Sequence, residues 1–468
     1  MEMLYGVKDR PSAGRLIVFA LQQLLAIIAG TITLPLIVGH GLSQSAALFG
    51  ASIGTLVYLA ITKFKSPVFL GSSFTYLGSM ISAFTGAAST AIGFFGIVLG
   101  ATLAGLVYVI LSLVVRKTGI GWVSKVMPPV IIGPVVMLIG LSLAPNAINN
   151  LYLGNVVVNN TPVASPLICI LVGLITLFII VVVATHSKGF MKLIPLIIGV
   201  FGAYIVAAVL TLIGNATGTD AIRIIDFSPM NDIQWVPDFS FLHFSQAFKD
   251  FTDTGTFWKY FGTIALLYVP LAFAVFAEHI ADHKNLSFII GKDLLNDPGL
   301  HRTLMGDGVG SIVGAFFGGC PNTTYGESIS CVAFSKNASI ITIVITSCLG
   351  IAISFFGPLM TFFETIPNCI IGGLSIALYG YIASSGLRML KVVNLNDQRN
   401  IFIISAILVT GIGGLVLNLY GFELPTVACS LIVGILINVV THVSPKKKVA
   451  VEPDMTNVDE QKQPANHQ

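Results

Sequence analysis

Apolar runs of about 20 residues recur along the chain from Gly14 to Val440, and short polar stretches separate them. A helix of this length crosses the hydrocarbon core of a bilayer. The pattern therefore predicts an all-α polytopic membrane protein with fourteen transmembrane segments. We expect these segments at residues 15–37, 45–62, 67–83, 90–115, 122–145, 166–185, 192–214, 258–286, 304–319, 321–335, 338–358, 366–387, 399–419 and 425–443.

Two segments, 67–83 and 321–335, are short and rich in Gly, Ser, Thr and Pro. Irregular backbone survives in hydrocarbon only where protein or a water-filled cavity pairs its polar groups. We therefore expect both segments to be broken, to face one another and to pair as short strands. Helix N-termini beside the breaks would then point N–H groups at a ligand. Close packing of helices through small residues is the alternative.

The chain also contains a weak internal repeat. The pattern Pro-x-x-Ile-Ile-Gly begins at Pro128 and again at Pro367, about half the chain apart. The pattern lies in segments 5 and 12 of the fourteen, and the two broken segments are numbers 3 and 10. Each pair is therefore seven segments apart. An odd number of segments inverts the second copy across the membrane, and paired broken segments point to a midplane binding site. The alternative is a chance match between Gly- and Pro-rich apolar strings.

Composition and charge agree with a membrane protein. Only 10% of residues are charged and 55% are hydrophobic, whereas soluble domains carry about 25% charged residues. With the N-terminus in the cytoplasm, all but three of the 24 lysines and arginines fall on the inner side. The exceptions are Arg223, Lys249 and Lys259, in or beside an external loop at 215–257. Both termini are therefore predicted to be cytoplasmic, and the net charge of +3 gives no indication of a nucleic-acid partner.

Targeting and cofactor signals are not found. The first apolar run is too long for a signal peptide and has no small-residue cleavage site. The six cysteines lie in or at the ends of apolar segments without metal or disulfide spacing, which indicates packing. We predict no metal and no cofactor, and a disordered cytoplasmic tail at 444–468.

Two carboxylates lie deep in apolar sequence, Glu278 and Glu327. An ionisable group at the bilayer centre costs about 2.5–3.5 kcal/mol, and its usual role is in a substrate or ion path. Asp282 lies four residues after Glu278 and shares its helix face, and His283 follows. Buried carboxylates and histidines exchange protons, which favours a proton-coupled carrier with Glu278 as the proton site and Asp282 or His283 as accessory. The alternative for Asp282 and His283 is that they cap the cytoplasmic end of their helix at the membrane interface.

Small, hydroxylated and aromatic residues surround these carboxylates in sequence. We expect the polar positions of the broken segments to contact the ligand: Ser72, Ser73, Thr323, Thr324, Tyr325 and Gly326. The aromatic residues Phe74, Tyr325 and Tyr379 are candidates to sandwich a flat ligand. Simple packing is the alternative for each aromatic residue.

Several of these strings resemble one known family. Pro321-Asn322-Thr323-Thr324-Tyr325-Gly326-Glu327, with Asp297-Pro298-Gly299-Leu300-His301-Arg302 before it, is similar to the bacterial uracil permeases of the nucleobase–ascorbate transporter (nucleobase:cation symporter-2) family. Ala277-Glu278-His279, Leu70-Gly71-Ser72-Ser73-Phe74, and Gly6-Val7 with Arg10-Pro11 add to the resemblance. It extends to about residue 443.

The resemblance implies two inverted seven-helix repeats, short antiparallel strands in segments 3 and 10, a core domain and a gate domain. It also implies a homodimer. From the carboxylate pair and the broken repeats we expect import of a nucleobase, with uracil preferred, by proton symport and an elevator-like movement of the core domain against the gate domain. The substrate-binding residues that it implies are Phe74, Glu278, Tyr325, Gly326, Glu327 and Tyr379, to which we add Ser73. The division is 1–14 (cytoplasmic), 15–115 and 258–358 (core), 122–214 and 366–443 (gate), 215–257 (external loop) and 444–468 (tail).

The chain departs from the uracil-permease pattern at three places. It has Gln22-Gln23 where the pattern has Gln-His, and Asp282 where the pattern has histidine four residues after the first glutamate. After the second glutamate it has Ser328-Ile329-Ser330 in place of Asn-x-Gly. The first two positions bear on proton coupling and the third on base specificity.

Three other functions are considered. A xanthine or urate carrier remains open, because these purines share the imide edge of uracil. An anion exchanger calls for a cation in the site, and no Lys or Arg occurs between Lys65 and Arg116 or between Lys259 and Lys284. An intramembrane enzyme is disfavoured, because no Gly-x-Gly-Asp, His-Glu-x-x-His or Gly-x-Ser-x-Gly motif occurs.

Overall fold

The computed structural model describes residues 3–119, 128–158, 161–188, 191, 195–419, 422–424 and 426–443. The predicted tail at 444–468 and the first residues of the segments predicted at 122–145, 192–214 and 425–443 lie outside this range. The helices are α1 (Ala13–Val38), α2 (Gln44–Ile61), α3 (Leu77–Thr85), α4 (Thr90–Thr118), α6 (Pro129–Ser142), α7 (Ala144–Leu151), α8 (Pro166–His186), α9 (Pro195–Thr217), α10 (Phe244–Asp250), α11 (Thr254–Ile290), α12 (Leu300–Gly318), α13 (Gly326–Ser335), α14 (Ile340–Ser354), α15 (Gly357–Glu364), α16 (Asn368–Met389), α17 (Gln398–Ile412) and α18 (Thr426–Val443). The strands are β1 (Leu70–Ser72), β2 (Val157–Val158), β3 (Thr161–Pro162), β4 (Asn322–Thr324), β5 (Leu417–Leu419) and β6 (Phe422–Leu424).

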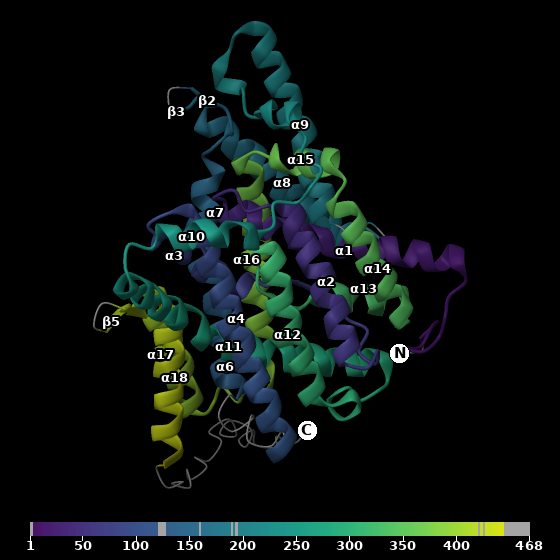
Figure 1. Ribbon diagram of the computed structural model, residues 1–468, viewed down its shortest axis with the longest axis vertical. Coiled ribbons are helices and arrows are strands. Elements are labelled where there is room, and N and C mark those ends of the chain that lie inside the picture. The colour runs from purple at the N-terminus through teal and green to yellow at the C-terminus, as the bar shows by residue number, and fades with distance from the viewer. Residues whose placement is uncertain are drawn as a thin grey trace, which may run out of the picture.

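The molecule is a helical bundle (Figure 1). Within the described residues, eight helices are long and apolar enough to cross a membrane, or nine if the bent pair α14 and α15 forms one span. This number is below the fourteen predicted segments, because several of those segments form helices shorter than a bilayer span. These helices make the chain a multi-pass membrane protein.

Three predicted segments end differently from expectation. The segment at 122–145 breaks after Ser142, and α7, with Pro145 in its first turn, extends to Leu151. The segment at 338–358 bends by 76° between α14 and α15, where Pro358 begins the second helix. Proline has no N–H to donate, and its fixed φ fits a helix start. The segment at 399–419 stops being helical at Ile412, and β5 then pairs with β6.

Local caps explain where several helices begin. The Ser43 and Ser89 hydroxyls accept from the N–H groups of Ala46 (3.1 Å) and Ile92 (3.2 Å). Asp253 accepts from the Thr256 N–H (2.7 Å) at the start of α11, and this hydrogen bond lowers the pKa of the Asp253 carboxyl. Each cap pairs an N–H group that has no partner inside its helix.

The helices pack in two sets. In the first, α12 packs against α2 and α4, and α14 packs against α1 and α2. In the second, α16 packs against α6, α7 and α8, and α17 packs against α18 and α6. Glycines bring α2 and α12 together, because a Cβ at Gly54 would lie 2.5 Å from the Gly310 carbonyl oxygen. Small residues at such crossings let membrane helices approach backbone to backbone.

The two broken segments pair at the centre of the first set. β1 and β4 are antiparallel, with Leu70 opposite Thr324 and Ser72 opposite Asn322, so the expected strand pair is confirmed. Side chains pair two of the outer backbone groups: the Leu70 N–H donates to Thr55 (2.9 Å) and the Asn322 N–H to Ser311 (2.9 Å). These two N–H groups therefore need no water.

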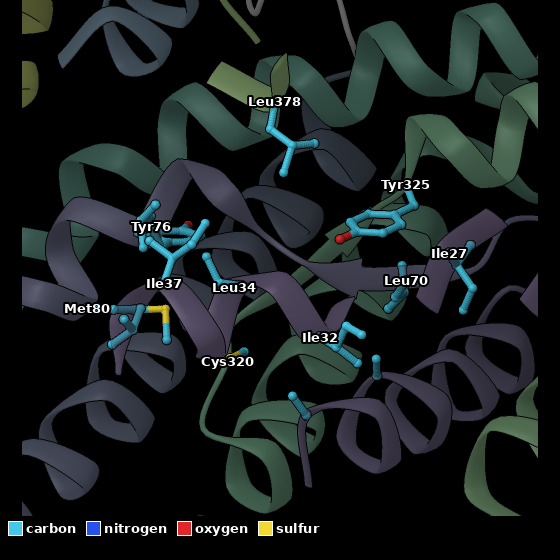
Figure 2. Close-up of a cluster of buried hydrophobic side chains, with 14 of the residues drawn as sticks. Ile27, Ile32, Leu34, Ile37, Leu70, Tyr76, Met80, Cys320, Tyr325 and Leu378 are labelled. Atoms are coloured by element: carbon cyan, nitrogen blue, oxygen red, sulfur yellow. The ribbon is translucent and has the colours of Figure 1, made fainter. Parts of the chain in front are cut away.

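A large apolar core surrounds this strand pair. Figure 2 shows Ile27 and Ile32 of α1 near Leu70 and Tyr325, which come from β1 and from the residue after β4, while Leu34 of α1 lies closer to Tyr76. The core holds the strands rigidly against α1, since close-packed interiors leave little room for displacement.

Candidate functional site

The strand pair brings two helix starts to one cavity. After β1 the chain forms a 3₁₀ turn at Phe74–Tyr76 and then α3, and after β4 it forms α13. The strands are antiparallel, so these helices leave in opposite directions and their N-termini converge. Helix N-termini present unpaired N–H groups and partial positive charge.

A cavity of about 520 Å³ lies at this point. Its lining comes from both strand segments, from α11 and from α6 and α16 of the second set. The lining residues are Ser72, Ser73, Phe74, Thr75, Val136, Glu278, Asp282, Asn285, Thr323, Thr324, Tyr325, Gly326, Glu327, Tyr381, Arg388 and Met389.

Three carboxylates face this cavity. Glu278 and Asp282 share one face of α11, as their spacing predicted, and Glu327 lies in the first turn of α13. The Thr75 hydroxyl donates to Glu278 Oε2 (3.3 Å), and the Thr324 hydroxyl donates to Asp282 Oδ2 (2.8 Å). The broken segments therefore orient both α11 carboxylates.

Most of the predicted site residues meet here. Ser73, Phe74, Gly326 and the three carboxylates line the cavity, together with Tyr325. His283 and Tyr379 are not among the lining residues. His283 is 1% exposed and pairs with the Tyr58 hydroxyl through Nε2 (2.8 Å).

Tyr379 is also buried, within α16. Two residues further along the same helix, Tyr381 lines the cavity in its place.

The ring of Tyr325 packs away from the open part of the cavity. Its hydroxyl donates to the Ser72 carbonyl oxygen (3.2 Å), and only 5% of the residue is exposed. A Cβ at Gly71 would lie 2.5 Å from the ring, and one at Gly30 would also clash with it. The ring therefore locks the loop before Glu327 onto β1 and α1 (Figure 2).

The sequence analysis missed one cation in the lining, Arg388. It lies in the last turn of α16, and its guanidinium carbon is 5.0 Å from the centre of the Tyr381 ring. Placement over an aromatic face is a favourable cation–π arrangement. From the sequence alone, Arg388 is a typical charged residue at a helix end. Only the packing of α16 places it in the same cavity as the three carboxylates.

Two departures from the uracil-permease pattern contact each other. The Gln23 side-chain amide donates to the Ser328 carbonyl oxygen (3.3 Å) and also to its hydroxyl. The same hydroxyl accepts from the Phe69 N–H (2.9 Å). These bonds connect α1, β1 and α13 just behind Glu327.

A second polar group, also missed, lies behind the cavity. His279 and Asp307 are both fully buried, and His279 Nδ1 is 2.7 Å from Asp307 Oδ2. His279 Nε2 is 3.0 Å from the Thr303 hydroxyl, and the Thr323 hydroxyl donates to Asp307 Oδ2 (3.4 Å). Neither His279 nor Asp307 lines the cavity.

The chemistry of the cavity suits a flat polar ligand. Carboxylates accept from ring N–H groups, while hydroxyls and helix N–H groups donate to carbonyl oxygens. In the part of the chain that the structure describes, no three His, Cys, Asp or Glu side chains form a group that could hold a metal ion.

The sequence matches a known family over most of its length. The model described as "Permease family" (Xan_ur_permease) matches residues 14–420. The uracil permease of Bacillus caldolyticus is 37% identical over 93% of this chain and 94% of its own length. The uracil permease of Escherichia coli (strain K12) is 32% identical over 92% of each chain.

Solved structures share the fold. The transmembrane domain of a cyanobacterium bicarbonate transporter, BicA, has a TM-score of 0.59 at 14% identity and covers 92% of this chain and 99% of its own. The SLC26A9 structure has a TM-score of 0.62 at 12% identity and covers 91% of this chain and 64% of its own.

Proposed function

The chain belongs to the Permease family, and from this premise we propose that it imports a nucleobase, with uracil preferred, across the cell membrane. The observation that carries the proposal is the cavity in which Glu278, Asp282 and Glu327 face two helix N-termini. Relatives that are 32–37% identical over more than nine-tenths of the chain are named uracil permeases, which supports the same substrate.

The recognition follows from the chemistry of uracil. Its ring N–H groups donate to carboxylates, and its carbonyl oxygens accept from N–H groups at the starts of α3 and α13. A site that pairs every polar group of its ligand rejects an analogue lacking one by up to about 10⁴-fold. The cavity of about 520 Å³ lies within the range of about 300–1,000 Å³ that is usual for small-molecule sites, so its size suits a single base.

We propose proton symport as the coupling, with Glu278 as the proton site and Asp282 and His283 as accessory groups. Three carboxylates around one cavity repel one another, and a proton on Glu278 relieves that repulsion. His283 contributes indirectly, through the helix that carries both acids.

We further propose that the first helix set is a core domain (15–115 and 258–358) that moves, elevator-like, against a gate domain (122–214 and 366–443). The cavity between them takes residues from both sets, which supports this division. The fourteen-segment inverted repeat, the cytoplasmic termini and a homodimer belong to the same proposal, the dimer by family resemblance.

Uptake by purified protein in liposomes tests the coupling. Labelled uracil is expected to enter faster when an inward pH gradient is imposed, and indifference to that gradient would remove the proton claim. Glu278→Gln and Glu327→Ala are each expected to abolish uracil binding. Full affinity in either variant would refute its assignment.

A purine carrier is the alternative on the same site, because xanthine and urate present a similar imide edge. Competition of labelled uracil by uracil, xanthine, hypoxanthine and urate separates the two. Anion exchange is the distant alternative, which Arg388 favours and the three carboxylates oppose. Chloride- or bicarbonate-driven exchange in the absence of any nucleobase would establish it.

A further inference from the structure

His279 follows Glu278 on α11, about 100° further around the helix axis, and it faces α12 rather than the cavity. It is fully buried, and its two ring nitrogens contact Asp307 (2.7 Å) and Thr303 (3.0 Å) of α12. Both ring nitrogens have hydrogen-bond partners, which fixes the orientation of the buried ring. The ring thus ties the helix that bears Glu278 to α12.

Asp307 extends this connection to the strand pair. Its Oδ2 atom accepts from the Thr323 hydroxyl in β4 as well as facing His279 Nδ1. Successive side chains in a strand point to opposite faces, so Thr323 faces Asp307 while Thr324 donates to Asp282 in the cavity. β4 is therefore joined to α11 directly through Thr324 on one face, and through Asp307 of α12 and His279 on the other.

The two connections bracket the substrate-binding carboxylates. Glu278 immediately precedes His279, and Glu327 lies four residues after Thr323 at the start of α13. The separation of Glu278 and Glu327 is thus determined by how α11 sits on β4. A ligand that bonds both carboxylates needs that separation held to within a fraction of an ångström.

We propose that His279 is a positioning residue: through Asp307 and Thr323 it sets the spacing between Glu278 and Glu327. It touches no ligand. The inference rests on the proposed function, since it concerns the affinity of the same site, and it adds His279 and Asp307, which the cavity lining does not contain.

Binding of labelled uracil by purified, detergent-solubilised protein tests the proposal. His279→Leu removes both polar contacts and is expected to raise Kd about tenfold or more. In His279→Asn, the side-chain amide replaces Nδ1 and still donates to Asp307, so Kd is expected to return close to that of the natural protein. Asp307→Asn is expected to raise Kd as His279→Leu does, and the double variant no further, because both changes break one connection.

Tyr204→Phe is the matched control. It removes a buried hydrogen bond of the same length, 2.7 Å to the Thr365 hydroxyl, without touching α11 or β4. It is expected to lower the melting temperature and leave Kd unchanged. If His279→Leu behaves like this control, with lower stability and unchanged Kd, the positioning role is wrong. Should His279→Leu fail to fold, Asp307→Asn gives the same decision, because Asp307 does not line the cavity.

Failure of the proposed function has a different result. In that case the natural protein itself binds no uracil, and none of the variants can be ranked by its Kd. Binding by the natural protein together with an unchanged Kd in His279→Leu and Asp307→Asn overturns only the positioning role.

Discussion

Thr75 shows how a single hydroxyl outside the obvious motifs contributes to the site. It donates to Glu278 Oε2 from the 3₁₀ turn after β1. A hydrogen bond to a charged group contributes about 1.5–3 kcal/mol, and this one is long, so the lower end applies. The side chain therefore limits the orientations open to the carboxylate.

Replacement of Thr75 by Val is expected to weaken uracil binding about tenfold, because Glu278 loses its orienting donor. Isothermal titration calorimetry measures the change. Thr102→Val is the control, since the Thr102 hydroxyl bonds only its own helix, at the Val98 carbonyl oxygen (2.8 Å). Equal affinities in the two variants would show that Thr75 does not act on Glu278.

Arg388 is the second residue whose importance the structure reveals. Arg388→Gln removes the positive charge from a cavity that holds three carboxylates. The guanidinium is solvent-exposed, so the effect on uracil binding is expected to be modest, about two- to fivefold weaker. Binding assays at low and high salt measure it, and the difference should shrink as salt screens the cavity. Complete loss of binding would instead give Arg388 a direct contact with the ligand.

At the scale of elements, the crossing of α2 and α12 supports the strand pair. Gly54 on α2 lies against the Gly310 carbonyl oxygen and also near the Asn322 side chain of β4. An extra methyl group at this crossing pushes α12 outwards, and overpacking of this kind costs about 1–3 kcal/mol.

Gly54→Ala is therefore expected to lower the melting temperature and to weaken uracil binding, because β4 moves with α12. A thermal unfolding experiment measures the melting temperature, and a separate uracil-binding assay measures the affinity. Gly14→Ala in α1 is the control, because no atom lies within 4 Å of a Cβ there. In that position alanine favours the helix by a few tenths of a kcal/mol up to about 1 kcal/mol. A stable Gly54→Ala protein with unchanged uracil affinity would show that the crossing of α2 and α12 does not support the strand pair.

At the scale of the whole molecule, the proposed movement requires the two helix sets to shift at the contact between them. An apolar cavity of about 120 Å³ lies between α1 of the first set and α9, α15 and α16. Val200 of α9 lines it and is 8% exposed. Filling this space adds contacts to one arrangement of the two sets and so favours it over others.

Val200→Phe is expected to slow uracil uptake severalfold while uracil binding stays measurable. Paired liposome uptake and equilibrium binding assays separate the two effects. Val206→Phe on the same helix is the control, because Val206 is 36% exposed on the outer surface. Loss of binding and uptake together would mean that the substitution damages the fold rather than the movement.

The sequence by itself determined the order of the elements and the location of the polar breaks. Long apolar runs give α4 at Thr90–Thr118 against the predicted 90–115, and the Gly- and Ser-rich breaks give β1 and β4. These features follow from local rules: hydrocarbon requires paired backbone, and an i,i+4 spacing places Glu278 and Asp282 on one helix face.

Tertiary structure alone decided which faces meet. Tyr381 lines the cavity and Tyr379 does not, because two positions on a helix differ by about 200° around its axis. The pairing of His279 with Asp307, and the turning of Arg388 towards three carboxylates, depend on how α11, α12 and α16 pack. Hydropathy gives the position of a residue along a helix axis, whereas the rotation of the helix about that axis is settled by side chains that lie far away in the sequence.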